Sequence, residues 1–133
     1  MVRFASLILL ATILKLSTGT TFIFGVQLIC ESDKVFRYRI EHKEYDLLSR
    51  DDILTYPRES YGQGDRTFFY EQAYDSWDLS PTFEPYVVLT HNCSSDRIHR
   101  KITRYLRPVD RSDSLAYIEY TLFLSDDDEL ANW

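Results

Sequence analysis

The two cysteines of this chain each end a segment with the pattern of a β-strand, and this arrangement restricts the fold more than any other feature. The first segment spans residues 25–30 and the second residues 83–93. Alternate side chains of a strand point to opposite faces, so each cysteine lies on the same face as the apolar residues of its strand. The residues of these two faces are Val26, Leu28 and Cys30, and then Val87, Leu89, His91 and Cys93. We therefore predict a sandwich or barrel of strands, joined by one disulfide between Cys30 and Cys93; free thiols are the alternative.

The first 19 residues have the pattern of a secretory signal peptide. Arg3 makes the start positive, residues 4–14 are almost wholly apolar, and small residues lead up to Gly19. The apolar run is shorter than the roughly 20 residues that a membrane-spanning helix needs. We predict cleavage after Gly19 and a secreted, extracellular protein that does not span a membrane. A buried N-terminal helix is the alternative.

The remainder of the chain reads as short alternating segments separated by polar turns. Residues 35–42 place Phe36, Tyr38 and Ile40 on one face, and residues 116–124 alternate in the same way. The inward residues of that last segment are Ile118, Tyr120, Leu122 and Leu124. About seven strands and no convincing long helix predict an all-β, immunoglobulin-like β-sandwich over residues 20–125.

The segments between these strands are less regular. Residues 67–70 form an aromatic strand after a glycine-containing turn at residues 62–65. Residues 98–106 fit either a strand or a helix. We expect a helical turn or a loop at residues 44–56, and a connection at residues 77–85, where two prolines argue against a helix.

Charge is distributed unevenly along the chain. The 21 acidic residues outnumber the 15 Lys and Arg residues, which gives a net charge of −6 and argues against nucleic-acid binding. Basic residues nevertheless gather in the basic segment, residues 97–111, which is our candidate binding patch for an anionic partner. The residues of this patch are Arg97, Arg100, Lys101, Arg104, Arg107 and Arg111. A solvated polar face is the alternative.

Residues 126–133 begin with the run Asp126 to Glu129 and are predicted to be an acidic C-terminal tail. Such runs are most often solvated and disordered. A weak cation site is the alternative.

Five motifs occur in a characteristic order along the chain. They are the segment ending at Cys30, the alternating strand from Val35, Asp51-Asp52-Ile53-Leu54, Phe68-Phe69-Tyr70, and Pro85-Tyr86 through His91-Asn92-Cys93. This order resembles the secreted transthyretin-like family of nematodes. The chain departs from that family at two turns, residues 31–34 and 65–68, so it looks like a divergent member. The resemblance implies a transthyretin-like β-sandwich that bridges or carries a lipid, a small hydrophobic ligand or a cell-surface partner.

A catalytic role would depend on His91, which faces inward beside Cys93. We expect a structural histidine that is hydrogen-bonded to the backbone, and a secreted hydrolase using His91 is the alternative. His42 and His99 lack a spacing that would gather them around a metal, and no phosphate-binding or dinucleotide motif is present. We therefore predict a binding protein with no enzymatic activity, cofactor or metal, whose partner is an extracellular protein, a lipid or a cell-surface molecule.

Asn92, Cys93 and Ser94 form a sequon for N-glycosylation. Alternation turns Asn92 outward, which leaves room for a glycan, but the cysteine in the middle position competes for the same site. Asn92 is therefore a possible glycosylation site, and both an occupied and an unoccupied Asn92 stay open.

Overall fold

The computed structural model describes residues 19–75 and 81–133, in which the regular secondary structure consists of β-strands. Seven strands have six or more residues: β1 (Thr20–Cys30), β2 (Val35–Glu44), β4 (Arg58–Gln63), β5 (Thr67–Asp75), β7 (Pro85–His91), β8 (Arg100–Tyr105) and β10 (Leu115–Leu124). Four have two residues: β3 (Asp52–Ile53), β6 (Thr82–Phe83), β9 (Val109–Asp110) and β11 (Glu129–Leu130). The predicted all-β class is confirmed.

The predicted signal peptide lies almost entirely outside the described residues, and so does part of the predicted connection at residues 77–85. A search of the described ranges for a helix long and apolar enough to cross a membrane finds none.

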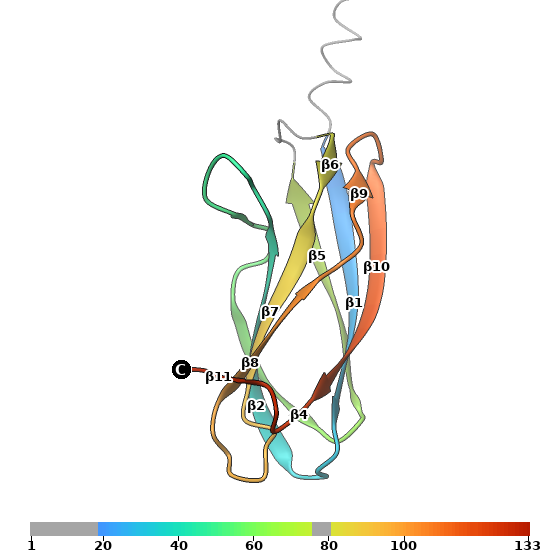
Figure 1. Ribbon diagram of the computed structural model, residues 1–133. Helices are drawn as coiled ribbons and strands as arrows, with labels where there is room; N and C mark the ends of the chain where they lie inside the picture. Colours follow the sequence, from blue (N-terminus) through green and yellow to red (C-terminus); the bar gives the residue numbers. More distant parts are fainter. Residues whose placement is uncertain (1–18, 76–80) are drawn as a thin grey trace, which may run out of the picture.

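The strands form two main sheets that face each other in an elongated sandwich (Figure 1). The smaller sheet has the order β10-β1-β5, and the larger has the order β11-β8-β7-β2-β3, with β4 also paired to β2. Strands β6 and β9 form a separate short pair. Strands β1 and β10 run parallel from Thr21 opposite Leu115 to Cys30 opposite Leu124, whereas the other paired strands are antiparallel.

The inward faces predicted from alternation form the hydrophobic core between the sheets. Its completely buried members include Phe22, Phe24, Val26, Leu28, Ile40, Val87 and Leu89. Aromatic side chains fill much of the space, as where Phe83 meets Phe22 edge-on with ring centroids 5.4 Å apart. Full burial of one such side chain contributes about 1.5–3 kcal/mol, so the alternating pattern carries most of the stability of the fold.

A disulfide joins Cys30, at the end of β1, to Cys93, which follows β7. The two strands belong to different sheets, so the bond connects the two layers of the sandwich. Its two cysteines are 63 positions apart, and closing a loop of that length in the unfolded chain stabilises the fold by roughly 4 kcal/mol. The predicted disulfide is confirmed.

Three sequence-based assignments need correction or completion. The predicted turn at residues 62–65 is shorter, because β4 continues through Gln63; the turn centres on Gly64, whose φ of 56° is in the left-handed region that favours glycine. The ambiguous segment at residues 98–106 is the strand β8, and residues 44–56 form a loop that contains β3. The hydrogen bonds between β7 and β8 favour the strand over the helix.

Alkylation of the folded protein without reduction should add no mass, because both thiols are oxidised in the disulfide. Reduction in denaturant followed by alkylation should add two alkyl groups, measured as intact mass. Two alkylated thiols in folded, unreduced protein would contradict the bond.

Gly62→Ala should destabilise the fold by about 1–3 kcal/mol, the usual cost of overpacking a core. A Cβ at position 62 would overlap the Phe36 ring and the hydroxyl of Thr67. Urea unfolding measures the effect. Gly25→Ala is the matched control, since a Cβ at position 25 would lie 3.2 Å from its nearest neighbour, Cε1 of the exposed Tyr70 ring. Equal losses at the two glycines would show that close packing at Gly62 is not the cause.

Candidate functional site

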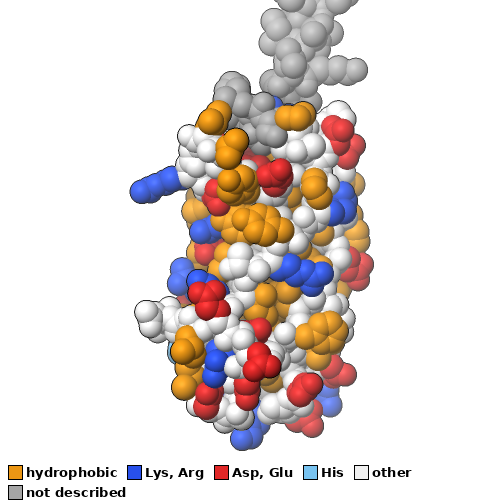
Figure 2. Space-filling view, in the orientation of Figure 1, with side chains coloured by type: hydrophobic (Ala, Val, Ile, Leu, Met, Phe, Trp, Pro, Cys, Tyr) orange, Lys and Arg blue, Asp and Glu red, His pale blue; other side chains and the backbone are white. Residues whose placement is uncertain are grey.

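The residues of the basic segment do not come together in one patch. Alternation along β8 places Arg100 and Arg104 on one face and Lys101 on the other. In Figure 2, the Lys and Arg side chains of the visible face are interspersed with acidic and hydrophobic ones. Arg100 and Arg104 therefore do not share a face with Lys101, and the binding patch predicted from the basic segment stays a prediction.

The arginines of the basic segment are engaged in contacts that hold the fold together. Arg97 donates to the carbonyl of Val35 over 2.8 Å. Arg100 pairs with Asp96 at 2.9 Å, and its side chain is only 13% exposed. These contacts limit the freedom of both guanidinium groups to bind a partner.

Arg104 and Arg107 both reach strand β10, which forms an edge of the smaller sheet. Arg104 donates to the carbonyl of Thr121 over 2.7 Å, and Arg107 donates to the carbonyl of Tyr117 over 3.0 Å. These contacts could not be predicted from the order of charges along the sequence, because they join β8 and the segment after it to a strand of the other sheet.

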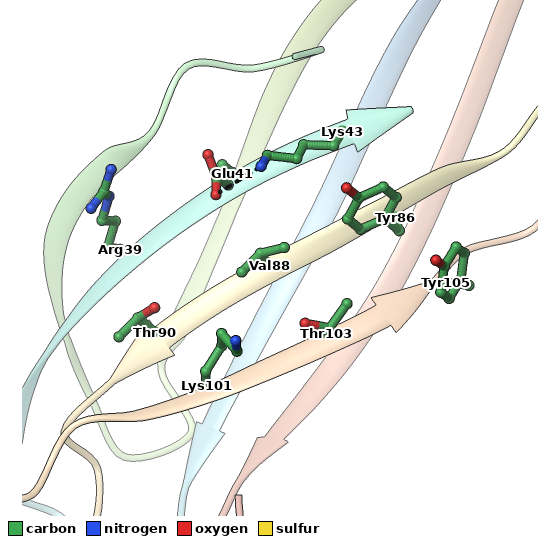
Figure 3. A pocket seen from close by; sticks show the side chains of 9 residues that line it. All are labelled: Arg39, Glu41, Lys43, Tyr86, Val88, Thr90, Lys101, Thr103 and Tyr105. Atoms are coloured by element: carbon green, nitrogen blue, oxygen red, sulfur yellow. Dashed lines mark ion pairs between the residues drawn. The ribbon is translucent and has the colours of Figure 1, made fainter. Parts of the chain in front are cut away.

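Lys101 lies instead in a shallow hollow on the outer face of the larger sheet (Figure 3). We call this feature the outer hollow. It has a volume of about 490 Å³ and is lined from three strands by Arg39, Glu41, Lys43, Tyr86, Val88, Thr90, Lys101, Thr103 and Tyr105. These residues lie at outward positions that face one another across β2, β7 and β8, so the register of the sheet brings them together.

The lining of the outer hollow carries three cations, Arg39, Lys43 and Lys101, and one acid, Glu41. Two further acids lie at its margin, since Asp51 contacts Tyr86 and Glu129 contacts Lys101. Lys43 lies 3.6 Å from Glu41, and Lys101 lies 3.7 Å from Glu129. Ion pairs at a solvated surface are weak, since each contributes roughly 0.2–1 kcal/mol to stability. The lysines can therefore exchange these partners for an anionic group that enters the hollow.

Two tyrosines close one end of the outer hollow. The rings of Tyr86 and Tyr105 have their centroids 5.2 Å apart, and the Tyr86 hydroxyl donates to Asp51 over 2.5 Å. Burial, followed by the hydrogen bond to Asp51, raises the pKa of Tyr86, which keeps its hydroxyl protonated. The hollow thus offers cations along its length and an apolar ring surface at its end.

His91 is completely buried, and both of its ring nitrogens are engaged. Nδ1 accepts a hydrogen bond from the Cys93 amide over 3.1 Å, so the proton of the neutral ring is on Nε2, which donates to Asp128 over 2.8 Å. Burial lowers the pKa of His91, while Asp128 opposes this effect. The backbone contact agrees with our expectation, and the arrangement suits a histidine that supports the end of β7.

The acidic tail was expected to be solvated, and Asp126 is exposed whereas Asp128 is half-buried. Asp128 accepts from His91, and Asp126 accepts from the amide and the hydroxyl of Ser95 over 3.0 and 2.7 Å. Glu129 and Leu130 then pair with β8 as β11. The carboxylates of Asp126 and Asp128 thus have hydrogen-bond donors that the sequence alone does not reveal.

A second buried histidine, His42, was missed as a polar link between the sheets. Its Nδ1 lies 2.9 Å from Glu71 on β5, and its Nε2 lies 2.6 Å from the hydroxyl of Tyr120 on β10. The ring of Phe24 stacks on it with centroids 3.9 Å apart. The signal was available, because His42 continues the inward alternation of Phe36, Tyr38 and Ile40.

Asn92 is half-buried, and its side-chain oxygen accepts from the Arg37 amide over 2.8 Å. The backbone amide of Asn92 donates in turn to the Arg37 carbonyl over 3.2 Å. The sequon therefore sits beside the middle of β2, and glycosylation of Asn92 stays a prediction.

The carboxylates of Glu44, Asp52 and Asp75 have oxygens within 4.8 Å of one another. Carboxylate oxygens are suitable ligands for hard cations, but acidic groups commonly cluster without one. We therefore assign no metal to these residues.

Residues 25–127 match the model of a protein family described as "Caenorhabditis elegans protein of unknown function (DUF870)". The chain is also similar to Protein lin-61 of Caenorhabditis elegans, with 31% identity over 108 residues. That alignment covers 79% of this chain and 17% of lin-61, so the chain spans about a sixth of that relative. No solved structure matches the chain.

The free energy of unfolding should fall as the pH drops below 6.5, in part because of His91. The folded pKa of His91 is lowered from its ordinary value of 6.5, so the unfolded state binds more protons between that value and the folded pKa. The contribution of His91 is complete above pH 6.5 and is lost as the pH falls through this window. Urea unfolding at about pH 8 and about pH 5 should therefore show that His91→Gln costs more at the higher pH. His99→Gln controls for the loss of a histidine, and a pH-independent cost for His91→Gln would contradict the assignment.

Proposed function

This chain belongs to the family of Caenorhabditis elegans proteins of unknown function designated DUF870, and from this premise we propose that it is a secreted binding protein without catalytic activity. The family description supplies no activity that could be transferred to the chain. The proposal is therefore built on the surface and the covalent chemistry of the sandwich.

Two independent features support secretion. The first 19 residues have the order of charged, apolar and small residues that signal peptides share. The disulfide between Cys30 and Cys93 is of a kind that persists in oxidising compartments and is rare in the reducing cytosol. We also propose that the sandwich is transthyretin-like, because the motifs that end in Cys30 and Cys93 resemble those of that family.

The binding role is carried by one observation, the concentration of positive charge in the outer hollow. Three cations and one acid line the hollow in a chain whose net charge is −6, and the acids at its margin, Asp51 and Glu129, engage Tyr86 and Lys101. Such a local field attracts an anionic group, because salt limits the influence of distant acids to about 8–10 Å. We propose that the hollow receives a phosphate or carboxylate group of an extracellular partner, such as a lipid head group.

The contacts of His91 support the absence of catalysis. A general base needs a free nitrogen within reach of its substrate, whereas the two nitrogens of His91 are held by Cys93 and Asp128. No observation in the described residues favours the alternative of a hydrolase.

The triple variant Arg39→Gln, Lys43→Gln and Lys101→Gln should weaken binding to phosphatidylserine-containing vesicles roughly five- to thirtyfold at low salt. Co-sedimentation with these vesicles, and with vesicles of phosphatidylcholine alone, measures the effect. Parent binding should also fall steeply as salt is added. The substitutions leave Arg100 and Arg104 in place, because those side chains hold structural contacts.

A matched control removes the same charge elsewhere, with Lys34→Gln, Arg50→Gln and Arg66→Gln, all at exposed positions. This control should bind vesicles nearly as well as the parent. Equal losses in the two triple variants would assign the effect to net charge and contradict a role for the outer hollow.

A further inference from the structure

The outer face of the smaller sheet carries exposed aromatic side chains from both of its edge strands. We call this surface the aromatic face and define it by Phe68, Tyr70, Tyr74, Tyr117 and Phe123. Between 46% and 70% of each side chain is exposed, although the neighbouring inward positions are buried. Aromatic side chains this exposed on one sheet face are typical of a binding surface.

Gly25 lies at the centre of the aromatic face, where its missing side chain leaves room for the neighbouring rings. Tyr70 and Tyr117 flank Gly25 from the two adjacent strands. A Cβ on Gly25 would lie 3.2 Å from Tyr70 Cε1 and 3.3 Å from the Tyr117 hydroxyl, so both rings lean over the glycine. Their centroids are 6.4 Å apart, and the Phe68 ring lies 4.9 Å from that of Tyr70. The three rings therefore form one continuous row, in which the Phe68 ring is at 90° to that of Tyr70 and the Tyr117 ring is tilted from it by 42°.

Hydrogen-bonding groups lie directly beside these rings. The Thr121 hydroxyl donates to Gln27 over 3.3 Å, and the Tyr117 hydroxyl donates to Glu119 over 3.2 Å. The hydrogen bond with Tyr70, followed by desolvation and Glu119, raises the pKa of Tyr117, which keeps its hydroxyl protonated. Amide, hydroxyl and carboxylate groups thus alternate with apolar ring faces.

The charge of the aromatic face restricts its ligand. Glu119 is the single charged residue among the outward positions of β1, β5 and β10, and these positions contain no Lys or Arg. Arg104 and Arg107 reach the border of the face, where the carbonyls of Thr121 and Tyr117 hold their guanidinium groups. The outward positions themselves offer an anionic ligand a carboxylate and no cation. The face is therefore complementary to a neutral ligand, in contrast to the outer hollow on the opposite sheet.

A second copy of the chain fits this surface poorly. Glu119 lies beside Gly25 at the middle of the face, so two copies related by a two-fold axis through this centre would bring their carboxylates together. Two unpaired carboxylates in a desolvated contact are unfavourable.

We propose that the aromatic face binds a neutral glycan of β-linked pyranose units. A pyranose ring has an apolar C–H face, which packs on the rings of Tyr70 and Tyr117, and a hydroxyl edge, which hydrogen-bonds to Gln27, Glu119 and Thr121. An equatorially linked chain is extended, so that successive units can follow the row of rings from Phe68 through Tyr70 to Tyr117. The inference goes beyond the proposed function, since it concerns a different sheet and a different ligand chemistry.

Calorimetric titration with cellohexaose and chitohexaose tests this inference. Binding of at least one of these oligosaccharides is expected, and Tyr70→Thr or Tyr117→Thr should each weaken it roughly tenfold. Threonine favours strands, so both variants should fold, which thermal unfolding checks. Tyr105→Thr, on the outer face of the other sheet, is the matched control and should bind like the parent.

Three results would overturn the inference: no binding of either oligosaccharide at millimolar concentration, equal binding by the tyrosine variants and the parent, or a dimer that these variants dissociate. The outcome is separable from that of the proposed function. The Arg39, Lys43 and Lys101 variant should bind the oligosaccharide normally, and the Tyr70 and Tyr117 variants should bind anionic vesicles normally.

Discussion

The fold depends on the position of β1 in the middle of its sheet. This strand pairs with β10 on one side and with β5 on the other, and its last residue is covalently joined to the opposite layer. A slip of one residue in either pairing would turn Phe22, Phe24 and Val26 from the core to the solvent. The disulfide opposes such a slip, since Cys30 must meet Cys93. Register and layer packing are therefore determined together.

The same alternation produces two outer faces of different chemical character. The outward positions of β2, β7 and β8 combine cations with tyrosines, whereas those of β1, β5 and β10 are aromatic and nearly uncharged. Between these faces, the buried His42 contacts Glu71 and Tyr120, and the buried His91 donates to Asp128. A module of this kind can present one surface to an anionic partner and the other to a neutral one at the same time.

Features that depend on local alternation could be predicted from the sequence, and features that depend on tertiary neighbours could not. Inward positions such as Val26 and Leu122, and the pairing of Cys30 with Cys93, follow from a period of two and from residue type. The parallel pairing of β1 with β10, and the contact of Asp128 with His91, connect residues that no local pattern links. The spacing of the basic segment along the chain likewise does not show that Arg104 reaches Thr121 while Lys101 lies on the other face of β8.

The contacts of Arg104 and Arg107 with β10 have a consequence for the behaviour of the protein at high concentration. A strand at the border of a sheet exposes backbone groups that can template the addition of another chain, which leads to polymerisation. Here two guanidinium groups already occupy carbonyls along that border, and an incoming strand would have to displace them and approach two positive charges. The two arginines therefore disfavour the addition of a further strand at β10, and with it the polymerisation of a chain that is rich in β-structure.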